Sequence, residues 1–69
     1  MDVKAPMVGK IIEVVVESGS QVAAEDDLLI IESMKMEIPV GAPRAGTVKE
    51  IRVAAGDTVQ EGDLLLVLE

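Results

Sequence analysis

A single lysine is the clearest candidate for chemistry in this sequence of 69 residues. Lys35 stands between Met34 and Met36 in the string Glu32-Ser33-Met34-Lys35-Met36-Glu37, and its primary amine is a group that can be acylated. Large apolar neighbours are unusual at an exposed chain reversal, where Gly, Asn, Asp and Ser are preferred. Taken alone, the three residues favour a plainer interpretation, an edge strand whose methionines point inward while the lysine points outward and blocks strand pairing.

The remaining polar residues indicate no second site. The sequence has no cysteine and no histidine, which removes disulfides, thiolate and imidazole ligands, and histidine acid-base catalysis. The glycines form no phosphate-binding string and are assigned to turns and bulges. The acidic cluster Glu25-Asp26-Asp27 lacks the spaced ligands of a calcium loop and is interpreted as a solvated turn. We therefore expect no catalytic residue and no metal site.

Composition and charge narrow the classes of partner. The net charge is −7 and no residue is aromatic, so neither phosphate attraction nor base stacking supports nucleic-acid binding. No apolar stretch approaches the roughly 20 residues of a membrane span, so direct membrane insertion is not expected. The residues that follow Met1 do not resemble a secretory leader, and we expect a soluble, cytoplasmic protein.

The sequence matches itself without a gap when it is shifted by 37 positions. Ala5-Pro6 recurs as Ala42-Pro43, and further identities follow throughout both copies. Two copies are too few for a solenoid, so the halves 5–32 and 42–69 are expected to pack as a two-fold related pair. The connector 33–41 then lies at one end of the molecule and the chain termini lie at the other.

Each half has the pattern of β-strands. Segments 10–16 and 47–53 are rich in β-branched residues and end at turn signals. Segments 28–31 and 64–68 are short apolar runs, whose length favours buried strands over a helix. We therefore expect an all-β protein without a helix, in which two small antiparallel sheets fold against each other as a flattened barrel or sandwich.

These features together resemble the biotin/lipoyl attachment family. Its biotinyl members carry a Met-Lys-Met core in a string of the type Glu-x-Met-Lys-Met-Glu, which residues 32–37 match. Ala5-Pro6-Met7-Val8-Gly9 and Ala42-Pro43-Arg44-Ala45-Gly46 are also similar to the family in type and spacing. The resemblance covers essentially the whole chain. It implies a flattened β-barrel of two four-stranded antiparallel sheets, a barrel-sandwich hybrid with internal pseudo-two-fold symmetry, and places Lys35 at a tight hairpin tip.

The resemblance also implies that residues 1–69 form a biotin carboxyl carrier domain, not an enzyme. Biotin protein ligase would join biotin covalently to Lys35. The arm would carry CO2 as carboxybiotin between a biotin carboxylase and a carboxyltransferase, or serve a decarboxylase. Met34 and Met36 are expected to support recognition and presentation of biotin, or to pack against the end of the barrel. Glu32 and Glu37 flank the motif.

Two other functions are alternatives. A lipoyl carrier on the same fold would serve a 2-oxoacid dehydrogenase complex, although such carriers typically have Asp-Lys-Ala at the tip. An unmodified interaction module would use the apolar hairpin as a docking edge.

One position departs from the family pattern, which has glycine there in both copies. Glu25 occupies in the first copy the place that Gly62 holds in the second. If Gly62 adopts a positive φ, either Glu25 carries a conformational cost of roughly 1 kcal/mol or the first turn takes another conformation.

Overall fold

The computed structural model describes residues 1–69 and consists of strands joined by turns, without a helix. The strands are β1 (Asp2–Lys4), β2 (Gly9–Val14), β3 (Gln21–Val22), β4 (Asp27–Ser33), β5 (Met36–Gly41), β6 (Gly46–Ile51), β7 (Thr58–Val59) and β8 (Leu64–Leu68). All pairings are antiparallel, within two four-stranded sheets. The expected all-β architecture is confirmed. No helix that could cross a membrane is present.

The two sheets have the same internal plan. One has the strand order β1-β8-β6-β3 and the other has the order β5-β4-β2-β7. A shift of 37 residues carries β2 onto β6, β3 onto β7 and the start of β4 onto the start of β8. Even the register irregularities correspond, since β2 and β4 shift between Ile11 and Glu13 while β6 and β8 shift between Val48 and Glu50. The duplication in the sequence is thus a duplication of topology.

A wholly apolar core joins the two sheets. Its 14 buried residues are all hydrophobic, and no side chain with a polar group is buried. Along β2 and β6 the buried residues Ile11 and Val48 are each followed by two exposed residues and then by a partly buried one. The register shift at these places thus interrupts the alternation expected for a strand with one face against a core. With neither a helix nor a disulfide, burial of this aliphatic layer is the main stabilising contribution to the fold.

Aspartate side chains close the turns at equivalent places. Oδ2 of Asp26 accepts a hydrogen bond from the backbone N–H of Ala23, and Oδ2 of Asp63 accepts one from Gln60. In each turn the carboxylate accepts from the backbone N–H three residues before it, so a side chain satisfies a backbone donor. Glu25 and Asp26 therefore belong to a turn, as the sequence predicts, whereas Asp27 begins β4. No group of acidic residues is arranged to hold a metal ion.

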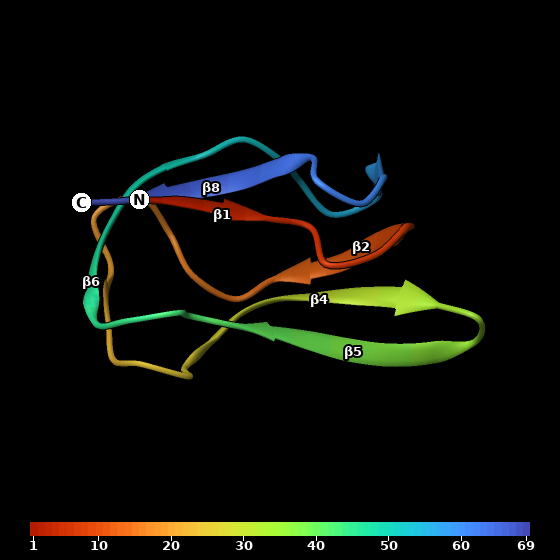
Figure 1. The fold of residues 1–69 in the computed structure, drawn as a ribbon, viewed down its shortest axis with the longest axis horizontal. Coiled ribbons are helices and arrows are strands. Elements are labelled where there is room, and N and C mark those ends of the chain that lie inside the picture. The colour runs from red at the N-terminus through yellow and green to blue at the C-terminus, as the bar shows by residue number, and fades with distance from the viewer.

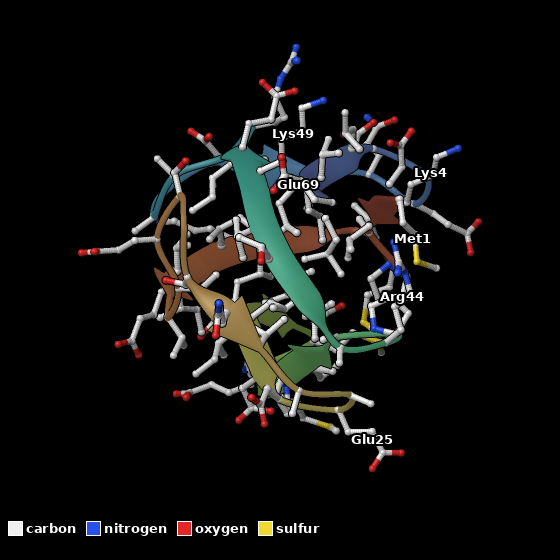
Figure 2. The ribbon with its side chains drawn as sticks, turned by 90° about the vertical axis from the view of Figure 1, so that its left-hand side faces the viewer. Met1, Lys4, Glu25, Arg44, Lys49 and Glu69 are labelled. Atoms are coloured by element: carbon white, nitrogen blue, oxygen red, sulfur yellow. The ribbon has the colours of Figure 1, made fainter.

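The β4–β5 hairpin and the chain termini lie at opposite ends of the molecule (Figure 1), which confirms the expectation from the duplication. The longest dimension of the protein is 30 Å and the other two are 18 and 17 Å. At the terminal end, Nη2 of Arg44 donates a hydrogen bond to the carbonyl of Glu69 and its Nε donates one to Sδ of Met1. Figure 2 shows Met1 and Arg44 side by side at this end.

The segment between the two copies is more regular than the sequence indicates. Residues 33–41 are expected to form a connector, but Met36–Gly41 form β5, which pairs with β4 along its whole length. Pro39 lies within β5 although proline has no N–H to donate to a neighbouring strand. It is tolerated because β5 is an edge strand. Of residues 33–41, only Met34 and Lys35 lie outside the strands.

Glu25 has a φ of 71° and Gly62 a φ of 90°, so the first turn keeps the conformation of the second despite the missing glycine. The side chain of Glu25 is exposed, forms no hydrogen bond and extends away from the protein (Figure 2). We predict that Glu25→Gly leaves the free energy of unfolding unchanged or raises it by up to about 1 kcal/mol, measured by urea denaturation. The matched variant Gly62→Glu is expected to lower it by about 1 kcal/mol. A marked loss in Glu25→Gly would show that Glu25 makes a contact that the fold needs.

Candidate functional site

Lys35 occupies a two-residue turn at the tip of the β4–β5 hairpin. Ser33 pairs with Met36, and the two residues between them, Met34 and Lys35, have φ values of 53° and 64°. Positive φ at both central positions is the mark of a type I′ turn, whose twist matches that of the flanking strands. Such turns favour Asn-Gly, so Met and Lys hold this backbone conformation at a conformational cost. The hairpin tip expected from the sequence is present. The backbone strain at Met34 and Lys35 is not predicted by the sequence.

The side chains of the tip are exposed to solvent. Met34 is 91% exposed and Met36 is 62% exposed, and Lys35 is exposed between them. Met36 therefore does not pack into the core, and neither methionine points inward as the plainer edge-strand interpretation requires. Lys35 takes part in no ion pair, since the one salt bridge of the protein joins Arg52 and Glu50. The amine is free to be received by a partner.

The hairpin is held on a rigid base. Strands β4 and β5 pair at six positions between Asp27 and Ser33, and the pairs nearest the core join Ile31 to Ile38 and Leu29 to Val40. Ile31 and Leu29 are fully buried. Because the ladder continues without interruption from these residues to Ser33 and Met36, the core fixes the direction in which the tip projects.

The two glutamates of the motif lie directly opposite each other. Glu32 pairs with Glu37, and both side chains are exposed one step below the turn. Like charges opposite each other destabilise an antiparallel pair by roughly 0.2 to 1 kcal/mol. Lys10 in β2 is the other neighbour of Glu32, but no ion pair forms between them. An acidic pair therefore lies just below the tip of the hairpin, and neither carboxylate forms an ion pair.

Gly9 is a supporting residue of the hairpin that the sequence shows only as a turn glycine. A Cβ at this position would overlap Cγ2 of Ile31 and would lie 2.6 Å from the carbonyl oxygen of Glu32. Glycine thus permits β2 to approach β4 closely, directly beneath the tip. The equivalent residue, Gly46, has more room, with the carbonyl oxygen of Glu69 at 3.1 Å.

An open groove of about 470 Å³ lies between β2, Glu32 of β4 and the turn that precedes β7. It is lined by Lys10, Ile11, Ile12, Glu32, Ala55 and Gly56. Glu32 is the one member of the predicted site in this groove, while Met34, Lys35, Met36 and Glu37 line neither this groove nor the one of about 380 Å³ between β1 and β5. The predicted site is accordingly a projecting tip and not a cavity.

A fold of two four-stranded sheets that presents a lysine on a projecting turn is the fold of biotinyl and lipoyl domains. The chain belongs to the biotin/lipoyl attachment family, since the family model described as "Biotin-requiring enzyme" matches residues 1–68. It is 49% identical over 68 residues to a biotinylated protein TB7.3 homolog of Mycobacterium leprae, covering 99% of this chain and 96% of the relative. In further mycobacterial relatives the match covers 55% of their length.

Much larger proteins contain a similar unit. The chain is 46% identical over 67 residues to pyruvate carboxylase of Bacillus subtilis, covering 97% of this chain and 6% of that enzyme. Urea carboxylase of Kluyveromyces lactis matches the structure with a TM-score of 0.94 and 36% identity, over 100% of this chain and 6% of that one. The lipoyl domain of the Azotobacter vinelandii 2-oxoglutarate dehydrogenase complex matches with a TM-score of 0.84 and 31% identity, over 100% of this chain and 95% of that one.

The strain in the turn can be tested by replacing Met34 with the residue that type I′ turns favour. We predict that Met34→Asn raises the free energy of unfolding by about 1 kcal/mol, because asparagine tolerates positive φ. The matched variant Met36→Asn removes a similar side chain where φ is not positive and is expected to bring no gain. Urea denaturation of both variants measures the difference, and equal effects would contradict the assignment of strain to Met34.

The close approach at Gly9 gives a second prediction. Gly9→Ala should lower the free energy of unfolding by about 1 to 3 kcal/mol, since the added Cβ meets backbone that cannot move aside easily. Gly46→Ala, which introduces the same methyl group at the equivalent place, should cost less because its nearest neighbour is farther away. Thermal unfolding of the pair compares them, and a larger loss in Gly46→Ala would refute the argument.

Proposed function

We propose that Lys35 is the site at which a biotin protein ligase attaches biotin covalently, and that the chain is a biotin carboxyl carrier. The observation that carries the proposal is the exposed, unpaired amine of Lys35 on a projecting turn between two exposed methionines. Formation of an amide requires an accessible amine that reaches into the ligase's active site. The family model for biotin-requiring enzymes and the biotinylated mycobacterial relative support biotin as the attached group.

The role proposed for the chain is that of a carrier, not a catalyst. Bound biotin supplies the ability to accept and release a carboxyl group. This chain contributes a support that holds the attachment point at the far tip of a rigid hairpin. A tethered group has a high effective concentration at every active site that the tether reaches. The proposed partners are a biotin carboxylase and a carboxyltransferase or decarboxylase, in keeping with the similar units of pyruvate carboxylase and urea carboxylase.

The residues around Lys35 have proposed roles in recognition. Met34 and Met36 offer apolar contact surface on both sides of the lysine, and exposed apolar side chains gathered in one place are typical of a docking site. Glu32 and Glu37 place two negative charges one step below the tip, where they would attract a basic surface of the ligase or a partner enzyme. The cost of opposing these charges is offset when such a surface binds.

Biotin is preferred over a lipoyl group because of the residues at the tip. The fold alone does not separate the two, since a lipoyl domain matches the structure closely. The motif does separate them, because Met34 and Met36 stand where lipoyl carriers typically have aspartate and alanine. The alternative of an unmodified interaction module does not explain why an exposed amine lies at the tip.

The proposal is tested by incubating the chain with biotin protein ligase, biotin and ATP and measuring its intact mass. We expect one biotin per chain, attached to Lys35, and no biotin on Lys35→Arg. The other exposed lysines act as internal controls, so Lys49→Arg and Lys4→Arg should be modified at the rate of the parent chain.

A parallel incubation with a lipoyl ligase and lipoate addresses the alternative. A lipoyl increment on Lys35 without any biotin increment would overturn the choice of biotin. Failure of the amine to react with either ligase would eliminate both carrier functions.

A further inference from the structure

We propose that Met34 and Met36 form an oxidation-sensitive pair, in which hydrogen peroxide converts Met34 and then Met36 to methionine sulfoxide and thereby slows acylation of Lys35. The preference for these two sulfurs follows from the structure alone. The effect on Lys35 rests on the proposed function. Two separate measurements therefore test the two parts.

The exposure of the four methionines differs in a graded way. Met34 is 91% exposed and Met36 is 62% exposed, whereas Met1 is 51% exposed and Met7 is partly buried. The sulfur of Met1 also accepts a hydrogen bond of 3.3 Å from Nε of Arg44, which withdraws electron density from it. Oxidation of a thioether follows its access to the oxidant. The expected order of rates is Met34, Met36, Met1 and Met7.

The chemical step balances with peroxide as the only co-reactant. A lone pair of the thioether sulfur attacks one oxygen of hydrogen peroxide, the O–O bond breaks and an S–O bond forms. The proton of the transferred hydroxyl passes to the leaving hydroxide, so the sulfur loses two electrons and the peroxide leaves as water. The sulfoxide is returned to the thioether by a methionine sulfoxide reductase, with two thiols that are oxidised to a disulfide as water is released.

Oxidation changes the surface that a ligase meets. Met34 and Met36 are the direct chain neighbours of Lys35, so an active site that receives the amine contacts them as well. Each sulfoxide replaces an apolar, flexible side chain by a polar, chiral one. Apolar contacts at the tip then become unfavourable, because the sulfoxide oxygen must leave water without a matched donor.

Trypsin resolves the four methionines, because cleavage after Lys4, Lys10, Lys35 and Arg44 places them on separate peptides. The unmodified chain is treated with hydrogen peroxide for increasing times, digested, and the sulfoxide on each peptide is measured by mass spectrometry. In the folded chain Met34 should oxidise first and Met7 last. In urea the four rates should converge, because the order arises from the fold. A folded chain in which Met7 or Met1 oxidises before Met34 or Met36 would overturn the proposal.

The consequence for Lys35 is measured as the initial rate of biotin attachment after peroxide treatment, divided by the rate of the untreated chain. We expect this ratio to fall roughly threefold or more, which corresponds to the loss of part of the apolar contact that one methionine side chain would make with the ligase. Reductase treatment should restore the rate. The double variant M34L/M36L should give a ratio near one, whatever its own rate. Met7→Leu is a control remote from the motif in sequence. After peroxide treatment its rate of biotin attachment should fall by the same factor as that of the parent chain.

The possible failures are distinguishable. Full oxidation of Met34 and Met36 with an unchanged rate of attachment would overturn the proposed effect on Lys35. An untreated chain that takes up no biotin would instead contradict the proposed function, while the peptide rates would still decide whether the pair is the preferred target of peroxide.

Discussion

The ladder of backbone hydrogen bonds between β4 and β5 is the interaction on which the position of Lys35 depends. Its inner part is anchored by Leu29 and Ile31, which are fully buried between the sheets. Its outer part extends past the core to the pair Ser33 and Met36. A lysine on a free loop would explore many orientations, whereas a lysine on a two-residue turn inherits the direction of both strands. The core thus determines the position of a side chain that it does not contact.

Several unfavourable features of the protein are gathered at this same hairpin. The turn has positive φ at two residues without glycine, two methionines face the solvent, and two glutamates lie directly opposite each other. Elsewhere the core is wholly apolar and no buried side-chain polar atom lacks a partner. Departures from the most stable arrangement tend to mark sites of function, because stability alone gives no reason to keep them. Glu25 lies outside this group, since its strain is in the turn before β4.

Much of the fold could be predicted from the internal repeat. The offset of 37 residues places two related halves, and it also places the connector opposite the termini, as the structure shows (Figure 1). The extent of β5 could not be predicted from the repeat, because Met36–Gly41 lies outside both copies and β1, at the equivalent place in the fold, has three residues. The role of Gly9 also lies beyond sequence reasoning. Glycine is required there because the backbone of Glu32 lies so close across the sheet that no Cβ fits, and the residue pattern along one strand does not reveal this distance.

The ends of the chain are neighbours at one pole of the protein, where the amine of Met1 donates a hydrogen bond to the carbonyl of Leu68 and Arg44 contacts both Met1 and Glu69. A unit whose entry and exit points coincide can be appended to a host polypeptide, or spliced into one, without disturbing its opposite pole. Similar units make up 96% of one relative and 6% of another. The architecture is therefore portable, because the pole at which the chain begins and ends is separate from the pole that carries the lysine.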